Sequence, residues 1–293
     1  MRPVSFAFEA IGTHWQIDYA ASDTLDEDLV RSRIDARIDE YDITYSRFRA
    51  DSLVTKISKK AGTYKLPLDS RRLFEVYHTL YRITGGQFTP LIGQVMEDAG
   101  YDSTYSLKPK KLTAPPPWEE CIQWNNGTLE TKRPVLLDFG AGGKGQLIDE
   151  VATVMEALDI FEYCIDAGGD IIYKTSKPRP LRIGLESPSD TSEVIGVVPV
   201  LNTSICGSAG NRRAWGAYHH IIDPKKLISP KTIAATWVMA DETLVADAIA
   251  TALFFTTAEV LQKEFSFSYC ILFDDHRIEH SDDFNAEFYY NKQ

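Results

Sequence analysis

The sequence has few cysteines, and none of them stand at a metal-binding spacing. Cys121, Cys164, Cys206 and Cys270 are far apart in a chain of 293 residues. Zinc sites built from cysteine use short repeated spacings, and small secreted scaffolds need a much denser set for their disulfides. The sequence therefore excludes both of these classes. We expect reduced thiols in a cytoplasmic protein.

Long apolar runs are also missing. The most apolar stretch, residues 244–255 (LVADAIATALFF), is short and contains Asp247. A helix that crosses a membrane needs about 20 apolar residues. The first residues (MRPVSFAFEAIGTHW) are interrupted by Glu9 and carry no cleavage site or lipidation motif. The sequence thus predicts no signal peptide, no lipid anchor and no membrane partner.

Positive charge is scarce. The chain carries 31 Lys and Arg against 42 Asp and Glu, which gives a net charge of -11. A nucleic-acid partner requires a basic surface to meet the phosphate backbone, so we exclude nucleic acid as the main partner. An acidic protein still binds a phosphorylated ligand when a helix terminus, a metal ion or a single lysine meets the phosphate.

The composition itself is that of an ordinary globular protein, with 44% hydrophobic and 25% charged residues. Helix and strand patterns mix without strict alternation. We therefore predict an α+β fold, with one compact domain over residues 1–293, a mixed sheet flanked by helices, and a ligand cleft. Helices are expected at about 25–41, 70–83, 144–158 and 242–255, and strands at about 6–19 (a pair), 162–166, 171–174, 181–186, 194–201, 235–239 and 268–273.

Several segments permit a finer prediction. In the first helix, Leu29, Ile34 and Ile38 are expected to face the core. Residues 101–118 have the pattern of a long loop. A hairpin is expected at 122–130, with its turn at residues 125–127 (Asn-Asn-Gly). Residues 135–137 (Val-Leu-Leu) are expected to form a strand that leads into the helix at 144–158.

The first candidate site segment is glycine-rich, at residues 137–149 (LDFGAGGKGQLID). Glycines such as Gly142 and Gly143 allow the backbone to approach an anion, and a helix that begins here offers free N–H groups. Lys144 adds a positive charge. The segment is not a Walker A motif, because Gly145 stands where Ser or Thr should follow the lysine. The alternative is a tight turn with a surface lysine.

Two further segments place polar side chains near expected turns. In residues 164–171 (CIDAGGDI), Asp170 is placed to accept hydrogen bonds from a sugar or base, or to stabilise a turn. In residues 219–224 (HHIIDP), adjacent histidines point to opposite sides. One of them, supported by Asp223, has the chemistry of a proton acceptor; the alternative is a structural histidine.

The fourth segment is the apolar helix at 242–255. Asp247 and Thr251 stand four residues apart and share one face of it. A buried unpaired carboxylate is expensive, and Mg²⁺, which prefers oxygen ligands, is one reason for such a pair. A narrow solvent-facing stripe is the alternative. No Ser-His-Asp or Cys-His signature is present, and a reaction at phosphorus needs positioning and charge neutralisation more than an enzyme nucleophile.

These four segments occur in the order and approximate spacing of the ApbE family of FAD:protein FMN transferases, which the chain resembles from about Gly12 to Phe255. Residues 11–15 (Ile-Gly-Thr-His-Trp) are similar to the Met-Gly-Thr opening of the family, and residues 46–52 (SRFRADS) to its Ser-x-aromatic segment. Residues 86–90 (GQFTP) are similar to its Gly-x-Phe-Asp-Pro, and residues 182–188 end in proline as in the family.

The resemblance implies a reaction and a set of site residues. The family transfers the FMN half of FAD to a Ser or Thr hydroxyl of an acceptor protein with an FMN-binding domain, and releases AMP. Asp247, Thr251 and the carbonyl of Gly143 would bind Mg²⁺, and His220 would be the catalytic base. The residues implied to contact FAD are Thr13, Phe48, Gly142, Gly143, Lys144, Asp170, Ser208 and His220.

The chain also departs from the family pattern. Ile11 replaces Met, Thr89 replaces Asp, and residues 206–209 read Cys-Gly-Ser-Ala instead of Ala-Thr-Ser-Gly. Residues 223–230 lack the usual Thr-Gly and are about one residue longer, so that loop is expected to affect acceptor choice. The alternative functions are a Mg²⁺-dependent FAD pyrophosphatase, which yields FMN and AMP, and a non-catalytic FAD-binding protein.

Overall fold

The computed structural model describes residues 2–125 and 127–289, and an eight-stranded sheet lies at its centre. The strand order is β1-β2-β6-β7-β10-β13-β14-β15, and each neighbouring pair is antiparallel. The fold is therefore α+β, but the expectation of a mixed sheet is wrong. The strands are β1 (Arg2–Ala10), β2 (Thr13–Ala21), β6 (Tyr163–Ala167), β7 (Asp170–Lys174), β10 (Thr203–Ala209), β13 (Ile233–Ala240), β14 (Ser268–Phe273) and β15 (Ile278–His280).

Two-residue turns explain part of the antiparallel pairing. Ile11 and Gly12 join β1 to β2 with φ of 44° and 76°, and Gly168 and Gly169 join β6 to β7 with φ of 67° and 98°. Turns with positive φ at both central positions match the twist of a hairpin. Gly168 is also required by a close approach, since a Cβ there would lie 2.2 Å from Oγ1 of Thr13. The two hairpin turns therefore lie side by side.

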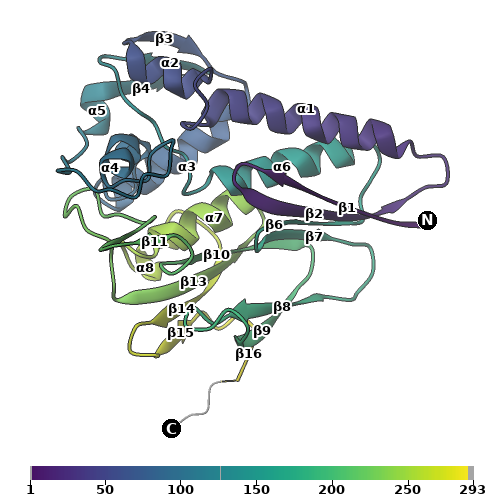
Figure 1. The fold of residues 1–293 in the computed structure, drawn as a ribbon. Helices are drawn as coiled ribbons and strands as arrows, with labels where there is room; N and C mark the ends of the chain where they lie inside the picture. The colour runs from purple at the N-terminus through teal and green to yellow at the C-terminus, as the bar shows by residue number, and fades with distance from the viewer. Residues whose placement is uncertain (1, 126, 290–293) are drawn as a thin grey trace.

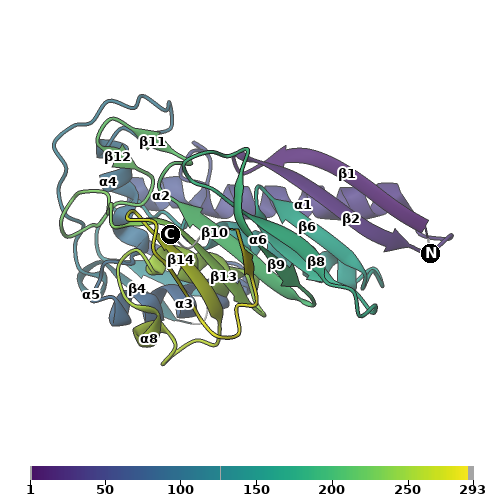
Figure 2. The ribbon, with the colours of Figure 1, turned by 90° about the horizontal axis from the view of Figure 1, so that it is seen from below.

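Helices cover one face of this sheet and a small sheet covers part of the other (Figures 1 and 2). The main apolar core lies between the helices and the large sheet, and a second core lies between the large sheet and the small one. The longer helices are α1 (Glu27–Tyr45), α3 (Ser70–Ile83), α6 (Gly143–Glu156) and α7 (Thr243–Ala252). The small sheet has the order β16-β9-β8, from β8 (Leu181–Glu186), β9 (Val194–Val200) and β16 (Glu287–Phe288).

The remaining elements are short and lie mostly at the end of the molecule away from the N-terminus (Figure 1). Within the described ranges, no helix has both the length and the apolar character needed to span a bilayer. The short elements are α2 (Leu53–Lys59), β3 (Gly62–Lys65), η1 (Pro90–Ile92), α4 (Gly93–Asp98), α5 (Trp118–Cys121), β4 (Ile122–Asn125), β5 (Thr128–Thr131), β11 (Ala214–Trp215), β12 (Tyr218–His219) and α8 (Ala258–Leu261).

Most of the expected elements are present, and the errors have physical reasons. Helix α3 and strand β8 have the predicted bounds. The predicted loop contains no helix or strand over residues 101–117, and α5 begins at Trp118. The predicted hairpin is β4–β5, and Asn126 of its turn lies outside the described residues. Leu29 is wrong as a core residue, since it is 43% exposed. Ile34 is buried and Ile38 packs against the core, as expected, and Val30 instead of Leu29 occupies the core position one turn before Ile34.

Two strands differ from the prediction: one expected strand is absent, and one strand that is present was not expected. Residues 135–137 are in no strand, and the backbone N–H of Asp138 donates to the carbonyl of Pro90 instead of to a sheet neighbour. Strand β10 was not predicted, because its sequence (TSICGSA) is rich in small polar residues and lacks the β-branched pattern of a strand. It nevertheless lies inside the sheet, between β7 and β13.

Helices α6 and α7 pack unusually closely, because glycines face the contact. A Cβ at Gly142 would lie 3.1 Å from Cβ of Ala248. A Cβ at Gly145 would lie 2.3 Å from the carbonyl oxygen of Thr243 and 2.8 Å from Cβ of Asp247. Any side chain at Gly145 would therefore separate the two helices. This contact brings the start of α6 beside Asp247 on α7.

Candidate active site

One cavity of about 930 Å³ collects most of the expected site residues. Its walls come from the β1–β2 and β6–β7 turns, the start of α6, one face of α7, strands β10 and β13, and the segment at residues 45–49. The expected residues that line it are Thr13, Phe48, Gly143, Lys144, Ser208, His220, Asp247 and Thr251, whereas Gly142 and Asp170 do not. The cavity is large enough for a dinucleotide-sized ligand.

Asp247 is buried, with 4% of its surface exposed. Its Oδ2 accepts a hydrogen bond of 2.9 Å from the backbone N–H of Gly145 at the start of α6. Thr251 lies one turn further along α7, and its Oγ1 is 3.3 Å from Oγ of Ser208 on β10. Because Asp247 is buried and both residues line the cavity, the alternative of a solvent-facing stripe is wrong.

The donor chemistry of this face suits a hard cation. A carboxylate and two hydroxyls converge on one side of the cavity, close to the first residue of α6. Within residues 2–125 and 127–289, no group of three or more His, Cys, Asp or Glu residues is placed to hold a metal. An ion at Asp247 would thus depend on hydroxyl, carbonyl and substrate oxygens, a mixture typical of Mg²⁺ sites.

Lys144 and Asp170 form an ion pair at the cavity wall. Asp170 is only 1% exposed, and its Oδ1 accepts a 3.1 Å hydrogen bond from the backbone N–H of Gly207. Asp170 therefore anchors Lys144 from behind the wall, which corrects the expectation that it lines the cleft. Gly142 is likewise a packing residue, since it contacts α7 and not the cavity.

The two adjacent histidines have different surroundings. His219 is held by the protein, since its Nε2 is 2.9 Å from the carbonyl oxygen of Pro230 and its Nδ1 accepts from the backbone N–H of Ile221. His220 lines the cavity, and its Nδ1 is buried without a hydrogen-bond partner. The two rings lie only 6.3 Å apart, so they do not point to opposite sides, although their surroundings differ.

Burial lowers the pKa of His220 to about 3, and the positive charge of Arg213 acts in the same direction. The imidazole is thus neutral near pH 7, and it becomes a stronger base when a negative charge such as a phosphate lies beside it and raises its pKa. Asp223 does not support this ring, contrary to expectation. Its carboxylate accepts hydrogen bonds from Gln87 and from the backbone N–H groups of Lys225 and Lys226. Asp223 therefore stabilises its own loop.

An aromatic wall was not anticipated from the sequence. Phe48, which is 38% exposed, stacks on Tyr105 with ring centres 5.6 Å apart and planes at 3°. Tyr101 meets both rings edge-on. Beneath them the Arg47 guanidinium lies 4.1 Å from the Phe48 ring centre and its Nε donates to Asp138 at 2.5 Å. These residues come from two loops that are far apart in the sequence, so no local pattern indicates the wall.

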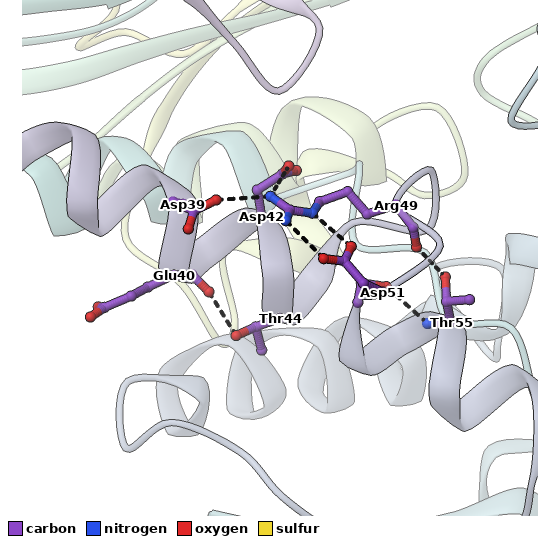
Figure 3. Close-up of polar contacts among 8 residues, drawn as sticks. Asp39, Glu40, Asp42, Thr44, Arg49, Asp51 and Thr55 are labelled. Atoms are coloured by element: carbon purple, nitrogen blue, oxygen red, sulfur yellow. Dashed lines mark hydrogen bonds and ion pairs between the residues drawn. The ribbon is translucent and has the colours of Figure 1, made fainter.

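A cluster of carboxylates fixes the loop that carries Phe48 (Figure 3). Arg49 reaches Asp39 and Asp42 at the end of α1 through Nη1, at 2.8 and 3.3 Å. The same guanidinium forms two parallel hydrogen bonds of 3.0 Å to Asp51. Because Arg49 is joined to α1 on one side and to its own loop on the other, residues 46–52 are held against the helix. The aromatic wall therefore has a rigid support.

A buried carboxylate, a lysine at a helix start and a neutral histidine in one large cavity define an enzyme site for a phosphorylated substrate. The chain belongs to the ApbE family, whose family profile matches residues 11–265. It is 22% identical to the FAD:protein FMN transferase of Klebsiella pneumoniae (strain 342), over 80% of this chain and 74% of that protein. It is 23% identical to the protein of the same name from Haemophilus influenzae, over 86% of this chain and 80% of that one.

Solved structures share the fold. Flavin transferase ApbE from Vibrio cholerae superimposes with a TM-score of 0.82 at 21% identity, over 97% of this chain and 98% of that one. The ApbE protein of Thermotoga maritima superimposes with a TM-score of 0.81 at 20% identity, over 96% and 97% of the two chains. The central antiparallel sheet and its helical layer are thus the architecture of this family.

Proposed function

We propose that this chain is a Mg²⁺-dependent FAD:protein FMN transferase. It moves the FMN half of FAD onto a Ser or Thr hydroxyl of a separate acceptor protein with an FMN-binding domain, and AMP leaves. The observation that supports this most strongly is the meeting of Asp247 and Thr251 with the start of α6 and neutral His220 in one cavity. Membership of the ApbE family and the names of the related proteins support the same reaction.

Each side chain has a role in this proposal. Thr13, Phe48, Lys144 and Ser208 contact FAD, with the Lys144 ammonium near the phosphates. The backbone N–H groups of Gly143 and Gly145 already donate to Phe139 and Asp247. Asp247, Thr251 and the Gly143 carbonyl would hold Mg²⁺, which would supply positive charge next to the pyrophosphate. This ion is proposed from the oxygen donors present.

His220 takes the proton in the transfer. The acceptor hydroxyl oxygen forms a bond to the FMN phosphorus while the bond from that phosphorus to the bridging oxygen breaks, and AMP departs with the bonding electrons. Since Nδ1 of His220 is buried, we infer that Nε2 is the nitrogen that takes the proton from the acceptor hydroxyl. A held acceptor hydroxyl has a high effective concentration, so it outcompetes water.

The acceptor is a separate protein in the cytoplasm in this proposal. The sequence contains no Gly-Ala-Thr, the acceptor pattern of the family, so the chain does not modify itself. The free state of Cys121, Cys164, Cys206 and Cys270 supports a reducing compartment.

Metal dependence tests the proposal directly. Purified protein is incubated with FAD and Mg²⁺, with and without exhaustive chelation by EDTA, and AMP release is followed by chromatography. We expect cleavage with Mg²⁺ and none after chelation, and restoration when Mg²⁺ is added back. Undiminished cleavage after chelation would exclude the metal role. Tighter binding of NAD or ATP than of FAD would contradict the assigned substrate.

The pH profile follows from the lowered pKa of His220. An ordinary histidine base, with a pKa of about 6.5, would lose activity below that pH. Because the pKa of His220 is about 3, we expect kcat/KM for FAD to show no fall from His220 between pH 7.5 and 5.5. A titration with a midpoint near 6.5 in the wild type, absent from the most active His220 variant, would contradict this.

The lowered pKa of His220 also makes the free energy of unfolding depend on pH. In the unfolded chain His220 takes up a proton below about pH 6.5, whereas the folded protein does so only near pH 3. The unfolded state therefore binds more protons in this window. The contribution of neutral His220 to the free energy of unfolding is complete above pH 6.5 and is lost as the pH falls toward 3.

A further inference from the structure

The two helices that form the proposed phosphate and metal site cap each other. Asp247 of α7 accepts the backbone N–H of Gly145 at the start of α6, at 2.9 Å. In return, Asp149 of α6 accepts the backbone N–H groups of Thr243 and Leu244 at the start of α7, each at 2.9 Å. Glu242, the residue at the N-cap position of α7, makes no capping bond with its own side chain. Asp149 therefore supplies the cap of α7 from another helix.

The two capping interactions are related by spacing. Asp149 stands one turn after Gly145, and Asp247 stands one turn after Thr243. The close approach at Gly145 makes both interactions short enough to form. Each helix therefore presents a carboxylate to the first turn of the other, and one of these two carboxylates is Asp247. A shift of α7 along α6 would break three hydrogen bonds together.

We propose that Asp149 is a positioning residue for the divalent-cation site. This inference rests on the proposed function, since it takes Asp247 and Thr251 as ligands. Asp149 does not line the cavity. It acts through α7, because its two oxygens fix the first turn of the helix whose next two turns carry Asp247 and Thr251. It thereby sets the distance from these two oxygen donors to Gly143 and Lys144 on α6.

Asparagine at position 149 changes the hydrogen bonds to the first turn of α7 without changing the size of the side chain. Asp149→Asn keeps the shape of the side chain, but only one oxygen accepts, and the amide group meets a backbone N–H that also donates. The first turn of α7 must then move. Asp149→Ser is a second variant, whose shorter side chain removes the carboxylate without placing a misdirected donor against the two backbone N–H groups.

The chain offers a matched control for loss of a helix cap. Asp26 accepts the backbone N–H groups of Asp28 and Leu29 at the start of α1, at 3.0 and 3.2 Å. Both bonds go to its Oδ1, and Asp26 does not line the cavity. Because an asparagine oxygen would still cap this turn, Asp26→Ala is the variant that removes a helix cap away from the site.

The experiment measures Mn²⁺ binding to the full chain, without FAD, by electron paramagnetic resonance, together with the melting temperature without metal. We expect Asp149→Asn to raise the Kd for Mn²⁺ by a factor of about 10 to 100, as loss of a group that orients a ligand does. Asp149→Ser should have a smaller effect in the same direction. Asp26→Ala should lower the melting temperature and leave the Kd for Mn²⁺ unchanged.

The outcomes separate the inference from the proposed function. Wild-type affinity in both Asp149 variants, or an equal loss in Asp26→Ala, would overturn the positioning role. Wild-type affinity in Asp247→Ala, or no Mn²⁺ binding by the wild type even when FAD is added, would instead overturn the proposed metal site itself. If Asp149→Asn does not fold, the Asp149→Ser variant decides the question by the same comparison.

Discussion

Asp247→Ala is expected to lower Mg²⁺-dependent cleavage of FAD by a factor of about 10³ or more. The change removes the buried carboxylate that faces the proposed ion, and metal ions contribute several kcal/mol of charge stabilisation in such reactions. The backbone N–H of Gly145 also loses its acceptor, which costs about 1 to 3 kcal/mol of folding stability. The protein should therefore fold with a reduced melting temperature. Initial rates of AMP release, measured over a range of Mg²⁺ concentrations, test this.

Asp241 provides the control. It is exposed and lies two residues before the start of α7, outside the cavity lining. Asp241→Ala removes the same charge from the same region, so its rate and its Mg²⁺ dependence should match the wild type. A wild-type rate in Asp247→Ala would show that the carboxylate holds no ion needed for turnover, and that its burial serves only the packing of α6 against α7.

His220→Ala should lower kcat for transfer by a factor of about 10² to 10⁴, the usual contribution of a positioned base. The KM for FAD should change far less, because the proposed contacts at Thr13, Phe48 and Lys144 remain. Rapid-quench measurement of transfer at saturating FAD, with FAD binding measured separately by fluorescence, distinguishes the two effects.

His219→Ala is the matched comparison. Its ring contacts Pro230 and Ile221 and is absent from the cavity lining. Its loss should therefore lower stability by about 1 kcal/mol for each hydrogen bond and leave kcat within a small factor of the wild type. Equal losses of transfer in the two variants would mean that the segment is structural and that the base lies elsewhere.

The sequence predicted the position of Asp247 well, for a general reason. A carboxylate on an otherwise apolar helix is costly unless something compensates for it, and the four-residue spacing placed Thr251 on the same face. Both conclusions depend only on local geometry. The expected difference between His219 and His220 is present, but it comes from the contacts of His219 with Pro230 and Ile221 and not from opposite orientations of the two rings.

Other parts of the site depend on packing that no local pattern encodes. Asp170 directly follows a hairpin turn, and its sequence does not say whether the carboxylate faces the cleft or Lys144 behind it. The stacking of Phe48 on Tyr105 requires two loops to meet. The capping of α7 by Asp149 requires a helix contact across about a hundred residues of sequence, as the separation of 94 positions to Thr243 shows.

The sheet illustrates the same limit at the level of the fold. The elements themselves were largely predictable, because hydrophobic periodicity is local. Their order was not, since β10 pairs with β7 and β13 through contacts that only the folded chain defines. The antiparallel pairing of every neighbouring strand in the large sheet likewise follows from connections and not from strand sequences.

The central claim is transfer of FMN to a protein, and the mass of the acceptor tests it most directly. The chain is incubated with FAD, Mg²⁺ and a broad set of separately purified FMN-binding domains, and the intact proteins are weighed by mass spectrometry. The account predicts that one acceptor gains the mass of FMN through a phosphoester at Ser or Thr, with AMP released in equal amount. It also predicts no mass gain on the chain itself. Formation of only free FMN and AMP with every domain would contradict the account and identify the protein as an FAD pyrophosphatase.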